Sequence, residues 1–248
     1  MSIITKYVAP ENMIGDFVQN FWMLENNSDE NIEATVLPDG MIDLFIFKSG
    51  IQPLQVALSG LETQPSQVVL DAKTKIFAVS FKLLAVDYIL HNSVSGFVNK
   101  AEKFSNKFWQ FESDDINDFE RFCKKVTDKI KSALPQYIDN RKKILFELIY
   151  FSNGSLTVME LSEQVYWSRR QINQYFNQQF GISLKAYCSI LRFRASFDHI
   201  KKGKLFPEQS FYDQAHFIKE VKKLSGVSPK ELKRNQNSRF LQFYNIAD

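Results

Sequence analysis

The chain is poor in the residues that build disulfide frameworks and metal centres. Its 248 residues include only two cysteines, Cys123 and Cys188, one in each half of the sequence, and only three histidines. There is no Cys-x-x-Cys pair, and the first 139 residues hold a single histidine, His91. A disulfide-rich scaffold and a metal-binding barrel with clustered histidine ligands are therefore both unexpected, and we predict no metal and no cofactor.

Signals for nucleotide chemistry and catalysis are also missing. None of the nine glycines stands at Gly-x-Gly spacing, there is no phosphate-binding loop, and no nucleophile has an evident base beside it. Pro38-Asp39-Gly40 together with Asp43 could form a pair of catalytic acids, but Pro-Asp-Gly is first of all a turn sequence. We therefore expect that the protein is not an enzyme.

Long apolar runs are absent as well. No stretch of about 18 apolar residues is long enough to cross a membrane. Residues 1–10 lack the basic segment and apolar core of a signal peptide. With so few cysteines, a cytoplasmic, reducing location is the expectation.

The chain does have enough apolar material for a sizeable core, and its charge is divided between two halves. Hydrophobic residues make up 44% of the sequence, including 23 phenylalanines. Residues 1–139 carry 13 basic and 19 acidic side chains, a net charge of −6, whereas residues 140–248 carry 18 and 9, a net charge of +9. This division favours two domains and a polyanionic partner for the second, although a solvated basic face would give the same count.

Residues 1–112 are expected to form a β-rich domain. Apolar and β-branched runs recur at residues 17–24, 41–47, 67–70 and 75–81, with turn residues between them. Short strands at this spacing are typical of a barrel or sandwich, with residues 85–92 as a short helix. The aromatic residues of these runs could line a ligand pocket, but filling the interior is the simpler interpretation. They are Phe17, Phe21, Trp22, Phe45, Phe47, Phe77 and Phe81.

Residues 113–140 are expected to link the two domains through a helix over residues 114–134. Ser113 is a suitable N-cap, and Pro135 ends the pattern. Apolar residues recur at helical spacing along this segment, which indicates either packing on the chain's own domain or a short dimer seam. The candidate seam residues are Ile116, Phe119, Cys123, Val126 and Ile130.

From residue 141 to residue 248 the pattern indicates helices throughout. Capping boxes, in which Ser or Thr is followed three residues later by Glu or Gln, mark helix starts at Thr157, Ser168 and Ser228. Gly181 ends one of these helices, and a long helix is expected over residues 184–201. The predicted fold class is α+β: an N-terminal β-barrel or sandwich-like domain, a linking helix and a C-terminal all-α domain.

An internal repeat with an offset of 45 residues runs through the helical region. Residues 181–187 resemble residues 226–232, and the same offset pairs the predicted N-caps Ser168 and Asp213. It also pairs the core positions Ile172 and Phe217. Because one register carries caps, core positions and helix ends, two copies of one structural unit are predicted.

Each unit offers a helix with a polar outer face, and in the first unit a short helix over residues 157–164 and a brief turn precede it. This is the arrangement of a helix-turn-helix. Arg, Asn and Gln can make paired hydrogen bonds to base edges, and Lys suits phosphates. Two tandem helix-turn-helix units that bind double-stranded DNA are therefore predicted between residues 141 and 235.

Residues 156–187, followed by Phe211-Tyr-Asp-Gln-Ala-His-Phe217, Lys222 and Gly226-Val-Ser-Pro-Lys230, resemble the DNA-binding domain of AraC/XylS transcription regulators over about 95 residues. The resemblance implies sequence-specific DNA binding by two recognition helices on either side of a long helix. By motif position it places base contacts at Arg170, Asn173, Gln174, Gln214, Ala215, Ile218 and Lys219, and phosphate contacts at Arg169, His216, Lys222 and Lys223.

The sequence departs from the family at three places. Tyr166 and Ser210 stand where the turn of each unit usually has Gly, and the segment 202–209 is short and contains Gly203 and Pro207. A regular two-turn supporting helix is therefore unexpected in the second unit, which favours base reading by the first unit and phosphate contacts by the second.

The N-terminal half resembles the family only loosely, in the motif over residues 37–45, which is similar to one found in a group of its small β-rich sensors. A small-molecule effector, RNA polymerase and a second copy of the chain are candidate partners beside DNA. The alternative is a ligand-binding or enzymatic β-barrel with a helical interaction module.

Overall fold

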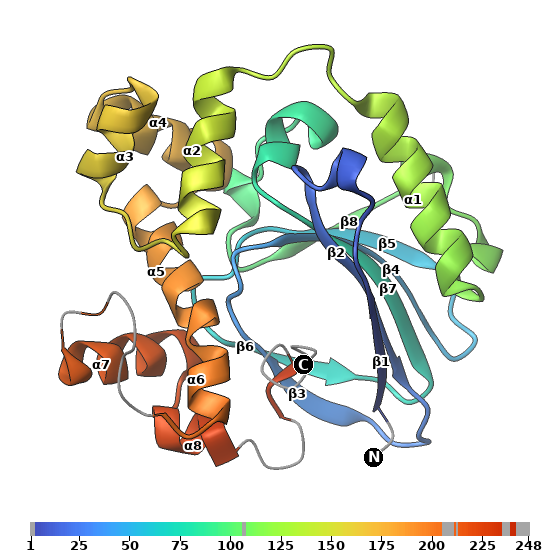
Figure 1. Ribbon diagram of the computed structural model, residues 1–248. Helices are drawn as coiled ribbons and strands as arrows, with labels where there is room; N and C mark the ends of the chain where they lie inside the picture. Colours follow the sequence, from blue (N-terminus) through green and yellow to red (C-terminus); the bar gives the residue numbers. More distant parts are fainter. Residues whose placement is uncertain (1–2, 106–107, 205–210, 212, 235–238, 242–248) are drawn as a thin grey trace.

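The computed structural model describes residues 3–105, 108–204, 211, 213–234 and 239–241 (Figure 1). Its first part is built on an antiparallel six-stranded sheet with the order β1-β2-β7-β4-β5-β8, and a separate antiparallel pair, β3-β6. All four predicted strand segments are present. The strands are β1 (Ile3–Val8), β2 (Val18–Asn26), β3 (Ile32–Val36), β4 (Ile42–Ser49), β5 (Gln55–Ser59), β6 (Ser66–Leu70), β7 (Thr74–Phe81) and β8 (Ala101–Phe104).

The six-stranded sheet has one face in the core and one face on an internal cavity. Successive side chains of a strand point to opposite faces, so Phe77 and Val79 of β7 lie on one side and Ile76 and Ser80 on the other. On the core side Phe77 packs against Phe119, with ring centroids 5.1 Å apart. The β3-β6 pair lies across the open face from the sheet, which gives this part the shape of an incomplete barrel (Figure 1).

Helix α1 (Phe119–Ala133) covers the core face of the sheet, so its apolar stripe packs on the chain's own domain, which is one of the two alternatives that the sequence left open. Ile116, Phe119, Val126 and Ile130 are 2%, 6%, 0% and 0% exposed inside the chain's own core, and Cys123 is partly buried against it. The apolar stripe faces the sheet because the sheet, and not a second chain, supplies the apolar surface that it needs.

The start of α1 also differs from the prediction. Ser113–Ile116 forms a separate short helical turn, and Asp118 is the N-cap of α1, accepting hydrogen bonds from the backbone N–H groups of Glu120 and Arg121. Glu112, and not the expected Ser113, is the N-cap of this turn. Ser and Asp are both residue types that favour the N-cap, so the stretch from Ser113 to Asp118 held two competing start signals for the helix.

The helical part follows α1. It comprises α2 (Asn140–Phe151), α3 (Val158–Val165), α4 (Arg169–Phe180), α5 (Leu184–Ala195), α6 (Phe197–Lys201), α7 (Gln214–Ser225) and α8 (Pro229–Arg234). The predicted capping boxes at Thr157, Ser168 and Ser228 are formed. The long helix expected over residues 184–201 is interrupted at Ser196, which separates α5 from α6. The predicted α+β fold class is confirmed.

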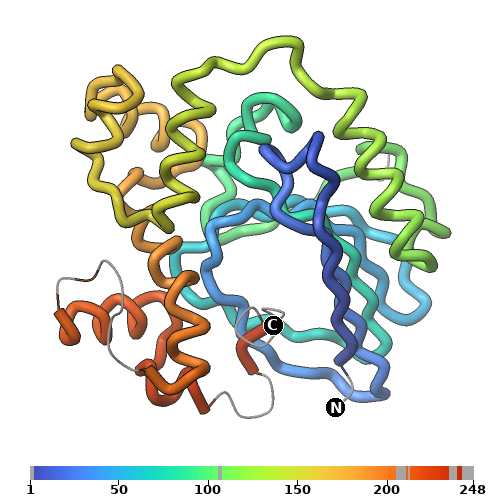
Figure 2. Tube along the Cα trace, viewed as in Figure 1, coloured from blue at the N-terminus to red at the C-terminus, as the bar shows by residue number. Residues whose placement is uncertain are grey.

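The trace from α5 into α6 passes along the edge of the β-rich part and carries the α2–α4 group at one end and α7–α8 at the other (Figure 2). A buried hydrogen bond joins α5 to the β-rich part, because Tyr187 Oη donates to the Gly40 carbonyl at 3.0 Å. Gly40 has φ +80°, and a Cβ there would lie 2.9 Å from Leu191 Cδ2. The Pro-Asp-Gly turn is thus the surface on which α5 packs, and it needs glycine for both reasons.

The first helical unit is fixed to the β-rich part at further points. The Val94 backbone N–H donates to the Gln179 carbonyl near the end of α4 at 2.9 Å. Tyr175 Oη donates to Asp87 Oδ2 at 2.5 Å, and Lys142 Nζ lies 3.0 Å from the same oxygen. These contacts, with a core cluster that runs through both parts, hold α4 in a defined orientation.

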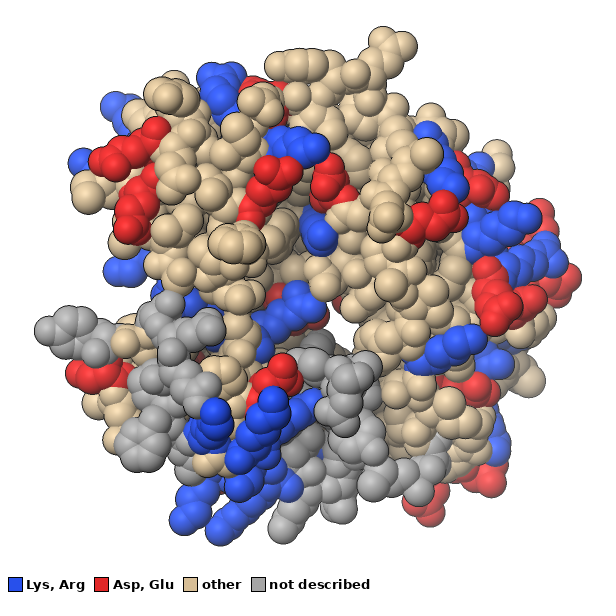
Figure 3. All heavy atoms as spheres, viewed as in Figure 1, with Lys and Arg blue, Asp and Glu red and all other residues tan. Residues whose placement is uncertain are grey.

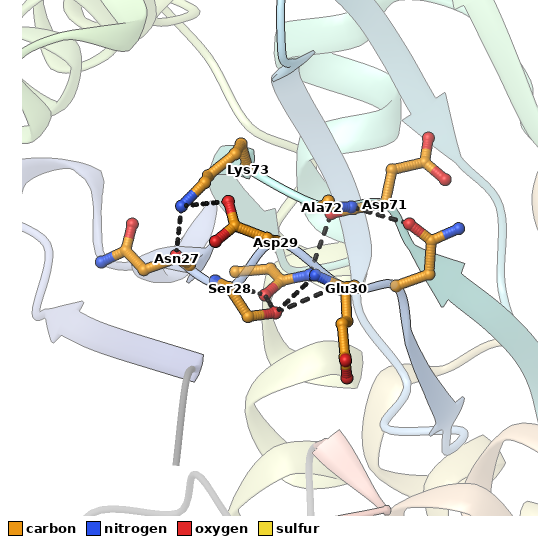
Figure 4. A network of polar contacts seen from close by, with 9 residues as sticks. Asn27, Ser28, Asp29, Glu30, Asp71, Ala72 and Lys73 are labelled. Atoms are coloured by element: carbon orange, nitrogen blue, oxygen red, sulfur yellow. Dashed lines mark hydrogen bonds and ion pairs between the residues drawn. The ribbon is translucent and has the colours of Figure 1, made fainter.

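A polar network ties the connection between β2 and β3 to that between β6 and β7. The buried Asn26 amide donates to the carbonyls of Glu30 and Asp71, both at 2.9 Å. Lys73 reaches the Asn27 carbonyl at 2.8 Å and Asp29 Oδ1 at 3.0 Å (Figure 4). The network joins the β3-β6 pair to the end of the six-stranded sheet and so fixes the far wall of the cavity between them.

Candidate nucleic-acid interface and internal cavity

The helices α3 and α4 form the first predicted helix-turn-helix, and the turn between them is tight. Tyr166 occupies it with φ 53°, in the left-handed region, while its side chain is 91% exposed. Ser162 Oγ donates to the Trp167 carbonyl at 2.6 Å, and Ser168 Oγ then accepts from the Gln171 N–H to start α4. The bulky residue is accommodated because its side chain lies in solvent and only its backbone is constrained.

The outer face of α4 carries the side chains that the sequence assigned to DNA. Arg169, Arg170 and Gln174 are exposed. Asn173 is half-buried and its amide donates to the Arg169 carbonyl at 3.1 Å, so it must leave that bond to reach a base. The opposite face of the helix, Ile172, Phe176 and Phe180, is buried.

The helix α7 has the same construction. Asp213 Oδ1 accepts from the His216 N–H at 2.7 Å, and Phe217, Val221 and Leu224 form the buried face. The residues assigned to base and phosphate contacts are exposed except for one; they are Gln214, Ala215, Ile218, Lys219, Lys222 and Lys223.

The exception on α7 is His216. Its ring centroid lies 5.9 Å from that of Phe211, and its Nδ1 is buried without a hydrogen-bond partner among the described residues. This inward placement makes His216 a poorer phosphate contact than the sequence pattern suggested. Most of the segment 202–209, and Ser210, lie outside the described residues.

A second group of basic side chains lies beside these helices and was not singled out from the sequence. Lys202 follows α6, and Lys230, Lys233 and Arg234 belong to α8; all four are exposed. In the space-filling view Lys and Arg side chains gather over α6 and α8 (Figure 3). In the sequence, the only sign of this group was the run of lysines that begins at residue 201. These lysines lie close to the basic residues of α8 because α6 and α8 pack together.

The β-rich part holds a cavity of about 620 Å³, and residues of α5 and α6 also line it. Its walls are the open face of the six-stranded sheet, the β3-β6 pair, and Arg194 and Phe197 from the helical part. Trp22, Phe45 and Phe47 line it, whereas Phe17, Phe21, Phe77 and Phe81 are packed in the core at 2% exposure or less. The aromatic residues thus divide between the two roles that the sequence left open.

One end of the cavity is polar, and its most prominent group is Asp43. Asp43 is half-buried, and Ser80 Oγ and Trp22 Nε1 donate to its Oδ1 at 2.5 and 3.5 Å. Burial, and then the nearby Asp39 carboxylate, raise the pKa of Asp43 to about 7, against the lowering effect of these hydrogen bonds and of Arg194. The Asp43 side chain therefore changes its charge near neutral pH.

Asp39 and Asp43, the pair of acids considered from the sequence, both line the cavity. Asp39 Oδ1 accepts a hydrogen bond from the Met41 N–H at 2.9 Å, which stabilises the turn. In the described part of the chain no cluster of three or more His, Cys, Asp or Glu side chains is arranged to hold a metal ion. None of the described helices is both long and apolar enough to cross a membrane.

Comparisons with known proteins give a family match for the β-rich part and solved structures of similar chain path for the whole chain. Residues 6–103 match the family described as "Domain of unknown function (DUF6597)". No curated protein matches the sequence.

Solved structures of ToxT from Vibrio cholerae have a similar chain path. A 1.65 Å structure is 13% identical over 93% of this chain and 97% of that chain, with a TM-score of 0.48. ToxT with an unsaturated fatty acid bound is 10% identical over 97% and 98%, with a TM-score of 0.45. A further crystal structure of ToxT is 12% identical over 99% of each chain, with a TM-score of 0.42.

Proposed function

We propose that this chain is a sequence-specific DNA-binding transcription regulator of the AraC/XylS type, in which α4 and α7 enter the major groove and the cavity holds an effector. The observation that carries the proposal is the pair of capped helices with one buried and one exposed polar face, each ended by a glycine in the left-handed conformation at Gly181 or Gly226.

The helical part offers two helices to DNA. The helices α4 and α7 both pack against α5, and Glu220 of α7 accepts a hydrogen bond from Ser189 Oγ of α5. Successive major grooves on one face of DNA lie roughly 34 Å apart, and the two helices would enter neighbouring grooves. The net charge of +9 over residues 140–248 supplies the attraction to phosphates.

The first test is a gel-shift assay on fragments obtained by genome-wide capture of DNA with the full chain. With about 6 phosphate contacts, the logarithm of affinity should fall against the logarithm of salt concentration with a slope of about −5. Equal affinity for captured and random DNA at moderate salt would contradict the proposal and favour a ligand-binding barrel with an interaction module.

The assignment of base contacts is tested by Gln174→Ala. We expect specific binding to weaken by about 1–3 kcal/mol and selectivity to relax at one base position, because a paired hydrogen bond to a base edge is lost. Gln164→Ala is the matched control, since Gln164 is exposed on α3, outside the proposed reading face. An equal loss of affinity for random DNA in the Gln174 variant would show that Gln174 does not read a base.

The extent of the protected DNA tests whether both units bind. Two engaged units protect two grooves about 10 base pairs apart, whereas one unit protects about 5–7 base pairs. The exposed basic residues Lys202, Lys230, Lys233 and Arg234 would add phosphate contacts next to the second unit, so we expect the longer footprint.

A further inference from the structure

We propose that the cavity binds a small molecule with an apolar body and a protonated amine, and that the amine is held by the carboxylate of Asp43. The inference rests on the proposed function, because it names the chemical class of the effector that the cavity would hold.

A polar row crosses four neighbouring strands at one end of the cavity. Ser80 of β7 pairs in register with Asn20 of β2 on one side and with Asp43 of β4 on the other. Ser59 of β5 continues the row, since its Oγ accepts from the Asp43 N–H at 2.9 Å. Residues paired across strands point to the same face, so the row forms one continuous polar edge along the cavity wall.

The row and its surroundings contain buried acceptors that no donor of the described residues satisfies. Asn20 Oδ1 and Glu62 Oε2 are buried and have no hydrogen-bond partner among the described residues. Both side-chain donors to the Asp43 carboxylate, from Trp22 and Ser80, use Oδ1, and no donor among the described residues reaches Oδ2. Buried acceptors are costly to leave unsatisfied, so a bound molecule that supplies several N–H donors is favoured. An ammonium group has three donors and no acceptor.

The charged side chains of the cavity also favour a positively charged ligand. The charged side chains that line the cavity are acidic Asp39, Asp43, Glu62 and Asp71, and basic Lys100 and Arg194. Two of the carboxyl groups, on Asp43 and Glu62, have raised pKa values, first through burial and then through Asp39. A carboxylate ligand would add a further negative charge here, whereas an ammonium ion relieves the repulsion and stabilises the ionised form of Asp43.

The remaining walls suit the apolar body of such a molecule. Next to Asp43, Trp22, Phe45 and Phe47 present aromatic surface, and Ile76 and Val68 add aliphatic surface. The Trp22 indole directs its Nε1–H edge at Asp43, which fixes the carboxylate at this end of the cavity. The volume of about 620 Å³ is typical of a site for a small organic molecule.

The class of ligand is tested on the full chain by calorimetry with three probes of equal length: octylamine, octan-1-ol and octanoate. We expect octylamine to bind at least about tenfold more tightly than octanol, because it gains an ion pair with Asp43. Octanoate should bind most weakly, because its negative charge is repelled by the carboxylates of the cavity. Octanoate binding as tightly as octylamine, or no binding of octylamine, would overturn the proposal.

Asp43→Asn tests the residue, because it keeps the size of the side chain and removes its charge. We expect the preference for octylamine over octanol to fall to about onefold. Asp128→Asn, an exposed position on α1 away from the cavity, is the control and should keep the preference. An unchanged preference in the Asp43 variant would overturn the assignment.

A pH series on the unaltered chain keeps the proposal testable if that variant fails to fold. Octylamine should bind about tenfold more weakly at pH 6 than at pH 8, because Asp43 must lose its proton to hold the amine while the amine stays protonated throughout. Asp39, Glu62 and Arg194 face the same end of the cavity. Their charges shift the pH at which octylamine binding is half-maximal, but binding still becomes tighter as the pH rises. Tighter binding at the lower pH would overturn the proposal.

Gel shifts in the absence of amine separate this inference from the proposed function. Specific DNA binding without amine binding would overturn the ligand class alone. Amine binding by a chain that shows no DNA preference would contradict the regulator and leave the Asp43 site standing.

Discussion

Replacing Asp43 by Asn should change how the stability of the protein depends on pH. The fold raises the pKa of this carboxyl from 3.8 to about 7, so the folded state favours the protonated form. The stabilisation is complete below pH 3.8 and is lost as the pH rises through about 7. Between about pH 5 and pH 8 the loss from this one group is about 2–3 kcal/mol. An Asn side chain does not ionise, so the Asp43→Asn variant does not lose this stability as the pH rises.

Urea denaturation followed by tryptophan fluorescence measures this effect. The free energy of unfolding of Asp43→Asn, minus that of the unaltered chain, should rise by about 2–3 kcal/mol from pH 5 to pH 8. Taking the difference removes the groups that titrate equally in both proteins. Asp128→Asn should show no such rise, because Asp128 is exposed. A constant difference for the Asp43 variant would mean that Asp43 is ionised throughout, which would refute the argument from burial.

Three further predictions concern backbone and packing. Tyr166→Gly should stabilise the protein by about 0.5–1 kcal/mol in a thermal melt, because Tyr166 has φ 53° and a mostly exposed side chain; a lower melting temperature would contradict this. Gly40→Ala should cost about 1–3 kcal/mol and increase cleavage by limited proteolysis, since its Cβ would meet Leu191 and Tyr187 at positive φ. Val126→Asp should unfold the β-rich part, with loss of cooperative melting, because it buries a charge in the core. If sedimentation instead shows a folded variant of lower mass, the α1 stripe would be a dimer interface after all.

The helical part was predictable because its signals are local. Thr157, Ser168 and Ser228 each sit three residues before their capping partners, and Gly181 and Gly226 end helices at the offset of the repeat. Such signals depend on neighbours in sequence and need no knowledge of the tertiary fold. The break at Ser196 had no comparable signal, since serine is tolerated inside helices.

The β-rich part was predicted less completely for two physical reasons. The strands β1, β3, β5 and β8 are short, and β8 reads Ala-Glu-Lys-Phe, which becomes a strand only through its pairing with β5. The face of α1 that meets the sheet has the same spacing as a dimer seam, and periodicity does not identify the partner.

The polar end of the cavity could not be assembled from the sequence, because it depends on strand register. Asn20, Asp43 and Ser80 are brought side by side by the order β2-β7-β4, which places the last strand of the three between the other two. The one available signal was an aspartate within an apolar strand, Ile42-Asp43-Leu44. A charged residue at such a position faces either solvent or a cavity. The sequence around it indicated a turn, a possible pair of acids and a sensor-like motif, but not the neighbours of Asp43 on the adjacent strands.

In the proposed regulator, that same motif links the cavity to DNA. Asp43 lies in the cavity wall, and Gly40, three residues earlier, accepts the hydrogen bond from Tyr187 of α5. Arg194, near the end of α5, lines the cavity as well. A ligand changes an equilibrium between arrangements only if its contacts differ between them, and a molecule between Asp43 and Arg194 touches both parts of the chain. Since α5 stands between α4 and α7, any arrangement that this ligand favours also sets the spacing of the two helices on DNA.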